Sequence, residues 1–348
     1  MTMVYLDHAA TTPVRFFAKD YYAFGNPNTL YKLGANEHKR LECAKEIVRK
    51  YLGVSSGRVI FGGTASMLID KLMQKVYEHP CMVYCSDFEH DAVWKYSVAS
   101  VEFEDFDYAE NWLDENDVVC WMLINNVTGE IFPVKGIGKS VKDNDGYFVM
   151  DCTAAIGHNV IPTNLESYCD CVVASAHKFG GPTGNGFMWL SDRFADYLGL
   201  DSLPGTPDVS GAMAVAAAFA SASNRDIGYR NNVWLRYIER LVLGLAEHNI
   251  EAVVLKKFYK TWAINAIRLY GIKSAPLIQY LSSHEIYVGA GRSACDSDDD
   301  DYRVLEVGYN VTVDEAEEII RVSFSTETTI QDIDTLVDAI VKYKEEYL

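Results

Sequence analysis

Short apolar runs alternate with longer amphipathic stretches through most of the chain before Asp226. Apolar runs bounded by polar residues are typical of buried strands, whereas apolar positions repeating at helical spacing are typical of helices. The expected strands are residues 59–61, 82–85, 118–124, 147–150, 171–174 and 187–190, and the expected helices are 64–77, 90–99 and 134–141. This alternation predicts an α/β fold with βαβ units and a largely parallel sheet.

The pattern changes after Asp226. An amphipathic helix begins there, and its apolar stripe contains Trp234, Leu235, Ile238, Leu241, Val242 and Leu245. Shorter strands are expected at residues 253–255, 263–267, 286–288 and 320–324, before a closing helix at 330–343. We therefore expect a second, smaller region of mixed helices and strands.

The formal net charge of the 348-residue chain is −18, which argues against nucleic acid or an anionic membrane as the main partner. Local amides and helix dipoles would have to hold any anionic cofactor, because the overall field repels it. The first residues form neither a basic nor an apolar signal region, so we expect a cytoplasmic protein. The longest nearly apolar run, residues 212–222, is too short to cross a bilayer and predicts a buried helix.

Eight cysteines in a chain without a leader are expected to be reduced thiols. Cys81, Cys85, Cys169 and Cys171 lie in strand-like apolar runs and lack the paired spacing of a zinc site. We interpret these four as core thiols and expect no metal site.

A lysine and an aspartate at the ends of two expected strands suggest the chemistry. Lys178 lies in a short turn, Ser-Ala-His-Lys at 175–178, before the glycine-rich residues 180–186, and Asp151 ends the strand at 147–150. A pyridoxal phosphate enzyme needs an amine to hold the cofactor as a Schiff base and a carboxylate to keep the pyridine nitrogen protonated. Lys178 alone would be read as a surface lysine; the strand-end Asp151 favours the cofactor interpretation, since ligands bind at the carboxyl ends of such strands.

Several short motifs occur in a characteristic order: YLDHAATTP at 5–13, GNP at 25–27, EHDAV at 89–93, NNVTG at 125–129, Asp151, SAHK at 175–178, GRSAC at 291–295 and IRVS at 320–323. With this order and spacing the chain resembles the cysteine desulfurases over nearly its whole length. These enzymes form the class V branch of the fold type I pyridoxal phosphate enzymes.

The resemblance implies a large domain with a mainly parallel seven-stranded sheet between helices and a smaller α+β C-terminal domain. The expected boundaries are an N-terminal segment, 1–13, packing near the active site, a cofactor-binding domain, 14–226, and a small domain, 227–348, with the catalytic cysteine loop. A homodimer is implied by the resemblance alone.

The resemblance also assigns roles to residues around the cofactor. Lys178 would form the Schiff base and later move protons at the substrate α-carbon, and Asp151 would pair with the ring nitrogen. His90 would stack on the ring and act in acid–base steps, for which imidazole suits neutral pH. The alternative for His90 is a helix-start residue bonded to backbone.

Other residues would bind the phosphate and the substrate. Ala65 and Ser66 open a helix directly after a strand, where free amides and the helix dipole favour an anion; Ser66 is equally compatible with a simple helix cap. Ser175 and His177 would complete the phosphate site. Arg321 would bind the substrate carboxylate as a bidentate ion pair.

Two further residues complete the expected site. Asn126 would bond near the cofactor ring oxygen or the substrate carboxylate. Cys295 would attack the sulfur of bound cysteine, giving alanine and a persulfide. The polar neighbours of Cys295 disfavour a buried structural thiol.

The chain departs from the family pattern at several positions. Ala154 replaces a glutamine that bonds the cofactor, and Ala212 aligns with a threonine that the partner subunit contributes to the phosphate, for which we expect Thr206 to substitute. The aspartates at 296 and 298–301 would disfavour a thiolate at Cys295, because like charges raise a thiol pKa. They are either a solvated loop or a steering surface for a basic sulfur-acceptor protein.

These observations predict a cytoplasmic, homodimeric, pyridoxal phosphate-dependent cysteine desulfurase acting on L-cysteine in sulfur metabolism and iron–sulfur cluster biogenesis. The alternatives are another class V enzyme, such as a selenocysteine lyase or a small-amino-acid aminotransferase or lyase, and a degenerate paralogue that binds a partner without turnover. Ala154 and Ala212 keep the last alternative open. The chain nevertheless keeps five residues that a degenerate site would not be expected to keep together: Lys178, Asp151, His90, Arg321 and Cys295.

Overall fold

The computed structural model describes residues 3–22, 24–159, 161–223, 226–291 and 302–348. Contacts divide the chain into two compact units. The large unit contains Pro13–Leu123 and Phe132–Arg225, and the small unit contains Met1–Thr12, Ile124–Ile131 and Asp226–Leu348. The small unit therefore includes one short segment from the middle of the chain, Ile124–Ile131.

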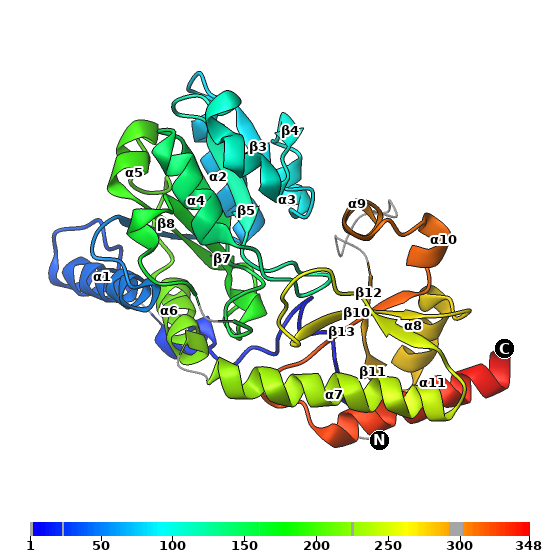
Figure 1. The fold of residues 1–348 in the computed structure, drawn as a ribbon. Helices are drawn as coiled ribbons and strands as arrows, with labels where there is room; N and C mark the ends of the chain where they lie inside the picture. The colour runs from blue at the N-terminus through cyan, green and yellow to red at the C-terminus, as the bar shows by residue number, and fades with distance from the viewer. Residues whose placement is uncertain (1–2, 23, 160, 224–225, 292–301) are drawn as a thin grey trace. The chain divides into compact units, whose positions relative to one another are not determined.

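A seven-stranded sheet forms the centre of the large unit (Figure 1), in the order β2-β8-β7-β6-β5-β3-β4. Strand β8 runs antiparallel to both its neighbours, and the other pairs are parallel. The expected seven-stranded, mostly parallel sheet is confirmed. The strands are β2 (Arg58–Gly62), β3 (Val83–Cys85), β4 (Ala99–Ser100), β5 (Val118–Met122), β6 (Tyr147–Asp151), β7 (Cys171–Ser175) and β8 (Gly186–Leu190).

Helices cover both faces of this sheet because alternate strand residues point to opposite sides. On one face the apolar side chains of β5 residues Val118 and Cys120 pack in a core with α2, α3 and α5. On the other face Phe187 of β8 contacts Phe219 of α6, and Phe148 of β6 lies against α4. The helices are α1 (Lys32–Leu52), α2 (Ala65–Val76), α3 (Asp91–Trp94), α4 (Val134–Asp143), α5 (Asp192–Leu198) and α6 (Val209–Ser223), with 3-10 turns η1 (Ala18–Tyr21), η2 (Phe103–Asn111), η3 (Leu165–Ser167) and η4 (Ala176–Lys178).

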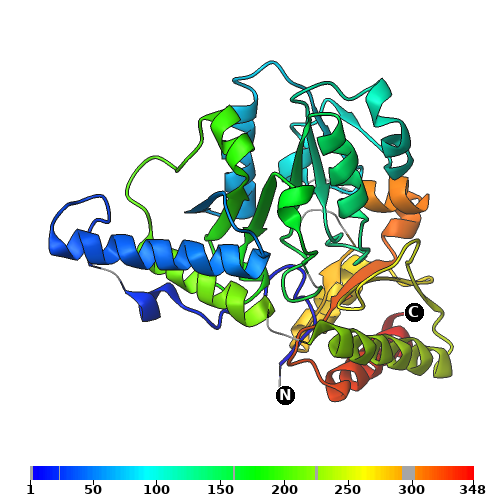
Figure 2. The same cartoon turned by 60° about the vertical axis from the view of Figure 1, so that its left-hand side comes forward.

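Helices α1 and α6 pack side by side (Figure 2). The run at 212–222 lies within α6 and is largely buried, as its composition predicted. In the part of the chain that the structure describes, no helix is both long and apolar enough to cross a membrane.

The expected helix at 90–99 is wrong in extent. Helix α3 ends at Trp94, and Ala99–Ser100 form β4, which pairs in parallel with β3. The hydroxyl of Ser97 donates to the carbonyls of Val83 and Ala99, at 3.3 and 2.6 Å. Side-chain hydrogen bonds to nearby carbonyls compete with the bonds of a helix, and this explains why α3 ends at Trp94.

The small unit has a four-stranded antiparallel sheet in the order β12-β13-β10-β9 and a parallel pair, β1-β11. The single strand expected at 286–288 is instead two strands, because β11 pairs with β1 and β12 pairs with β13. The strands are β1 (Val4–Tyr5), β9 (Ala252–Val254), β10 (Ile264–Leu269), β11 (Ile286–Tyr287), β12 (Gly289–Ala290) and β13 (Ile319–Ser323).

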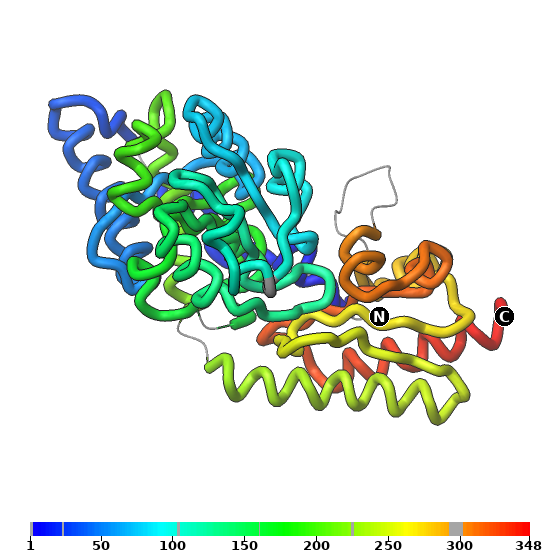
Figure 3. Tube along the Cα trace, turned by 45° about the horizontal axis from the view of Figure 1, so that its top comes forward, coloured from blue at the N-terminus to red at the C-terminus, as the bar shows by residue number. Residues whose placement is uncertain are grey.

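Two long helices of the small unit, α7 (Ile227–Glu247) and α11 (Ile330–Tyr347), lie side by side (Figure 3). Helix α7 begins directly after Asp226, as its amphipathic pattern predicts, and the side chain of Asp226 caps it by accepting from the amide of Tyr229 at 3.0 Å. The other helices are α8 (Ser274–Ser283), α9 (Arg303–Tyr309) and α10 (Val313–Ala316).

The seven cysteines that the structure describes are free thiols. Cys85, Cys169 and Cys171 are buried, as expected of core thiols, whereas Cys81 is only partly buried. Burial raises the thiol pKa of Cys81, Cys169 and Cys171.

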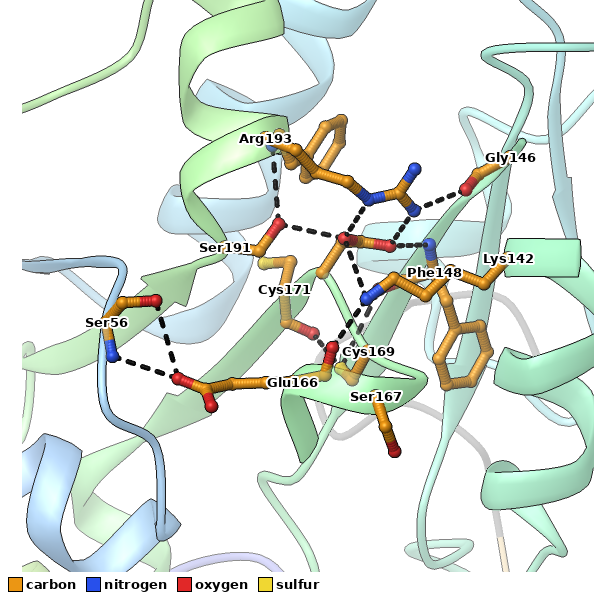
Figure 4. Close-up of polar contacts among 12 residues, drawn as sticks. Ser56, Lys142, Gly146, Phe148, Glu166, Ser167, Cys169, Cys171, Ser191 and Arg193 are labelled. Atoms are coloured by element: carbon orange, nitrogen blue, oxygen red, sulfur yellow. Dashed lines mark hydrogen bonds and ion pairs between the residues drawn. The ribbon is translucent and has the colours of Figure 1, made fainter. Parts of the chain in front are cut away.

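A fully buried carboxylate, Asp170, is held by an ion-pair network at the start of β7. Its partners Arg193, Ser191 and Lys142 are labelled in Figure 4. The guanidinium of Arg193 donates to both carboxylate oxygens, at 2.7 and 2.6 Å, and the hydroxyl of Ser191 donates at 2.8 Å. The ammonium of Lys142 lies 3.8 Å away, and the amide of Phe148 in β6 donates at 3.2 Å. The network therefore joins β6, β7 and α5 at the end of the sheet opposite Asp151.

The small unit buries a second charged group. Glu130 is 0% and Lys260 1% exposed, and their backbones form an isolated bridge. Glu130 accepts from the amides of Lys257 and Phe258, at 2.5 and 2.9 Å, while the Lys260 Nζ lies 5.1 Å from the centroid of the Trp262 ring. Burial lowers the pKa of Lys260 to about 7, although the charge of Glu130 opposes the shift.

We expect Arg193→Ala to lower the free energy of unfolding by about 3 kcal/mol, because it leaves a buried carboxylate without its main counter-ion. Arg58→Ala is the matched control: Arg58 has a similar exposure but pairs with the exposed Asp192, Asp196 and Asp201. Its loss should cost less than about 1 kcal/mol. Urea denaturation measures both, and equal losses would contradict this account of Asp170.

Lys260→Met should change the pH dependence of stability. Above pH 7 the folded protein keeps Lys260 neutral, whereas the unfolded chain holds this proton up to its ordinary pKa of 10.5. The unfolded state thus binds more protons in this window, so the wild type gains stability relative to Lys260→Met as pH rises, by up to about 1.4 kcal/mol per pH unit. Denaturation at pH 7 to 10 measures the difference, with Lys39→Met, on an exposed lysine of α1, as control. Parallel curves for wild type and Lys260→Met would refute the assignment.

Candidate active site

Lys178 is the last residue of the turn η4, directly after β7. The turn is compact because Gly181 lies against it: a Cβ at position 181 would stand 2.7 Å from the Cβ of Ala176. Strand β8 approaches equally closely, since a Cβ on Gly186 would lie 2.5 Å from the carbonyl of Ala174. The glycines after Lys178 thus allow β8 to return beside β7 and fix the turn that carries the lysine.

Three of the expected cofactor-binding residues lie near one another in the large unit. Burial raises the pKa of Asp151, and hydrogen bonds from Thr153 and the charges of His90 and Lys178 oppose that shift. The amide of Thr153 donates to the Asp151 carboxylate at 2.7 Å. The structure therefore gathers Asp151, His90 and Lys178 at the carboxyl ends of the strands, where an α/β sheet binds its ligands.

His90 is the N-cap of α3, and its Nδ1 accepts from the amide of Ala92 at 3.1 Å. This bond places the proton of the neutral ring on Nε2. His90 therefore does bond to the backbone at the start of a helix, which was the alternative that the sequence left open. In the neutral ring its Nε2 is then the atom that holds the proton.

The start of α2 lies against the end of β7. The amide of Ala65 donates to the Ser175 hydroxyl oxygen at 2.6 Å. Thr64 is the N-cap, accepting from the amide of Met67 at 3.4 Å, so the alternative that Ser66 caps the helix is wrong. Ser66 is the second residue of the helix, and its amide belongs to the first turn, where amides lack helical partners.

His177 is part of the same turn as Lys178. Burial, with a smaller contribution from the charge of Lys178, lowers the pKa of His177 to about 4. The imidazole is therefore neutral near pH 7, and it can offer a hydrogen bond to a phosphate without adding charge.

A cavity of about 320 Å³ in the large unit is lined by residues from the turn before α2 and from the loop before α6. Thr206 lines it and accepts a hydrogen bond from Asn26 at 3.3 Å. Ala212 of α6 lines the same cavity, as does Gly63 from the turn before α2. Ala154 lies elsewhere, and its carbonyl is 3.1 Å from the Nδ1 of His158.

The small unit holds the other expected substrate-binding residues. Arg321 lies on β13 and is 3% exposed; its Nη1 donates to the carbonyl of Asn126 at 3.2 Å. Asn125 shapes this segment, because its side-chain oxygen accepts from the amides of Val127 and Thr128, each at 2.9 Å. The two expected residues are thus joined through the backbone carbonyl of Asn126.

Sequence reasoning missed the residue that pairs with Arg321. The Arg321 Nη2 donates to the Asp7 carboxylate at 2.9 Å. Asp7 belongs to the YLDHAATTP motif, and its position as a lone acidic residue in that short segment was the available signal. Cys295 and the aspartates that follow it lie outside the described residues, so the expectation for the cysteine loop stays a prediction.

The residues of the large unit fit pyridoxal phosphate. The Lys178 amine and the Asp151 carboxylate lie close together. Burial raises the pKa of Asp151, so its ionised form would gain from a positive charge beside it, such as that of a protonated pyridine. The first turn of α2, the Ser175 hydroxyl and the neutral His177 supply uncharged donors suited to a phosphate.

Comparison with known proteins finds relatives over nearly the whole chain. A full-length relative, cysteine desulfurase IscS of Methanosarcina thermophila, is 25% identical and aligns with 97% of this chain and 91% of its own. A desulfurase IscS of Dictyoglomus turgidum is 32% identical over 54% of each chain.

Solved structures share the fold. A NifS-like protein superposes with a TM-score of 0.84 over 99% of this chain and 100% of its own, at 23% identity. The apo cysteine desulfurase of Thermococcus onnurineus NA1 gives a TM-score of 0.78 over 99% of this chain and 95% of its own, at 17% identity. The model of the aminotransferase class-V family matches residues 4–199, more than half of the chain. The chain therefore belongs to the class V aminotransferases, a family of pyridoxal phosphate enzymes.

Proposed function

We propose that this protein is a pyridoxal phosphate-dependent cysteine desulfurase that converts L-cysteine to L-alanine and holds the sulfur as a persulfide on Cys295. The observation that carries the proposal is the cluster of Lys178, Asp151 and His90 beside the first turn of α2. Cofactor retention and proton transfer at an amino acid both need this set of groups.

Bound pyridoxal phosphate supplies an electron sink for the α-carbon of the amino acid. Lys178 would hold the cofactor and would carry the α-proton on its Nζ. The Asp151 carboxylate would keep a proton on the pyridine nitrogen, because burial disfavours a carboxylate that has no cation beside it. His90 would stack on the ring and would exchange a proton through its Nε2, because its Nδ1 accepts from the amide of Ala92.

The phosphate would be held by Ala65, Ser66, Ser175 and His177, with Thr206 as a further donor. The Ser175 oxygen already accepts from Ala65, so its own proton can point to the phosphate. The amide of Ser66 and the neutral imidazole of His177 add donors without charge. In the small unit Arg321 and Asn126 would bind the substrate carboxylate.

The thiol of Cys295 completes the balance of atoms. Its Sγ attacks the sulfur of L-cysteine, the carbon–sulfur bond breaks, and a sulfur–sulfur bond forms. The released carbon takes up a proton and becomes the methyl group of alanine. One cysteine and one protein thiol thus give one alanine and one persulfide, and the reaction itself needs no external oxidant or reductant.

We further propose a cytoplasmic homodimer that delivers sulfur to an acceptor protein, for example in iron–sulfur cluster biogenesis. An exposed apolar stretch in the large unit supports the dimer: the segment before α1 and its first turn expose Tyr22, Phe24, Leu30, Tyr31 and Leu33. Leu30 is fully exposed. Several exposed large apolar side chains within one short segment favour an interface there.

Desulfuration is tested by measuring alanine and sulfide from L-cysteine with pyridoxal phosphate and a dithiol reductant. We expect both products from wild type, neither from Cys295→Ala, and loss of the bound-cofactor absorbance in Lys178→Ala. Because Cys295 receives the sulfur, its loss should abolish turnover while cofactor binding persists.

The alternatives give different results in the same assay. Equal alanine release from wild type and Cys295→Ala would move the assignment to a lyase that works without the thiol, and selenocysteine tests that branch directly. No product from a wild type that binds cofactor would favour a degenerate paralogue or an obligatory activating partner.

The dimer is tested by light scattering over a range of concentrations. We expect a two-chain mass for wild type and a shift toward one chain for Leu30→Glu combined with Leu33→Glu, because buried carboxylates would oppose the contact. Leu243→Glu, on an exposed leucine of α7, is the control and should stay dimeric. A wild type that remains a single chain at all concentrations would refute this part of the proposal.

A further inference from the structure

The N-terminal segment aligns an acidic side chain with Arg321. The amide of Ser323 donates to the carbonyl of Leu6 at 2.7 Å, and the amide of Ala9 donates to the Ser323 hydroxyl at 2.8 Å. Asp7 itself bridges to Ser323 in a parallel register. These backbone contacts fix Asp7 along β13, two residues from Arg321, so the pair does not depend on a flexible surface contact.

The geometry of the pair is set by a glycine. A Cβ on Gly289 would lie 2.7 Å from the Asp7 Oδ1 and 2.9 Å from the Arg321 Nη2. Gly289 pairs with Arg321 across β12 and β13, so any larger residue there would push into the ion pair. The strand next to β13 thus leaves room for the Asp7–Arg321 contact.

The guanidinium is oriented from two sides. Its Nη2 donates to Asp7 at 2.9 Å and its Nη1 to the carbonyl of Asn126 at 3.2 Å, so two of the five N–H donors of the fork fix its plane. Arg321 is 3% and the Asp7 side chain 19% exposed, so solvent screens the pair only weakly. The carboxylate of Asp7 therefore cancels part of the positive charge that Arg321 presents to any other anion.

We propose that Asp7 is a positioning residue that orients Arg321 toward the substrate carboxylate and weakens its attraction for that carboxylate. The inference rests on the proposed role of Arg321 in substrate binding. Orientation raises turnover because a fixed fork holds the amino acid in one pose. Partial neutralisation keeps the amino-acid product from binding too tightly, since product and substrate carry the same carboxylate.

Three variants separate orientation from charge. Asp7→Asn keeps an oxygen that accepts from Arg321 but removes the charge. Asp7→Ala removes both. Gly289→Ala keeps both charges but crowds the contact. Asp334→Asn is the matched control, because it removes one carboxylate charge from an exposed pair with Arg240 in the same unit.

The measurements are L-alanine affinity of the cofactor-loaded protein by calorimetry, KM and kcat for L-cysteine, and the melting temperature. For Asp7→Asn we expect L-alanine to bind about fivefold more tightly and KM to fall by a similar factor, because one negative charge near the ligand is gone. For Asp7→Ala and Gly289→Ala we expect kcat to fall about tenfold, because the fork is no longer held. Asp334→Asn should match wild type in all three.

Unchanged L-alanine affinity and KM in Asp7→Asn, together with unchanged kcat in Asp7→Ala and Gly289→Ala, would overturn the proposal. A lower melting temperature with those constants unchanged would leave the pair a structural role only. If Asp7→Ala does not fold, Asp7→Asn and Gly289→Ala carry the test. The L-alanine titration needs no desulfuration, so failure of the proposed function leaves this readout intact. Conversely, active enzyme with L-alanine affinity insensitive to Asp7 would refute this inference alone.

Discussion

The position of β7 within the sheet is the constraint on which the candidate site depends. Strand β7 is held in parallel by β6 and in antiparallel by β8, so its last residue, Ser175, has a fixed place. From there the turn η4 carries Lys178, β6 ends at Asp151, and the Ser175 hydroxyl binds the first amide of α2. A lysine, a carboxylate and the start of a helix come together because the strands that precede them end at one edge of one sheet.

Two carboxyl groups of the large unit, Asp170 and Asp151, differ in how completely their surroundings compensate the cost of burial. Asp170 lies at the opposite end of β7, where Arg193 and Ser191 satisfy it fully and it joins strands to a helix. Asp151 is less completely compensated, and burial raises its pKa. A carboxyl left in this state is poised for a cationic ligand, whereas a satisfied one only supports the fold. The net charge of the chain is strongly negative, so such local arrangements, and not the overall field, must recruit an anionic cofactor.

Most elements of the fold follow from the hydrophobic pattern. The buried strands and the long helices α2, α6, α7 and α11 lie where apolar runs and helical periodicity predict them, because each buries a face long enough to dominate local preferences. Helix α3 and strand β4 were predicted less well. There the hydroxyl of Ser97 and pairing with β3 decide the conformation, and neither leaves a periodic signal. The division of 286–290 into two strands likewise depends on partners distant in the sequence.

The sequence by itself determined the family and the α/β class and named most of the candidate site residues, since these follow from residue types in a fixed order. Tertiary structure decided which groups meet. Only the sheet brings Asp151 beside Lys178 and His90, and only the register of the N-terminal segment along β13 pairs Asp7 with Arg321. The same holds for the cap of α2, which is Thr64 and not Ser66. Contacts between residues hundreds of positions apart arise from strand pairing and burial, which no local pattern of the chain encodes.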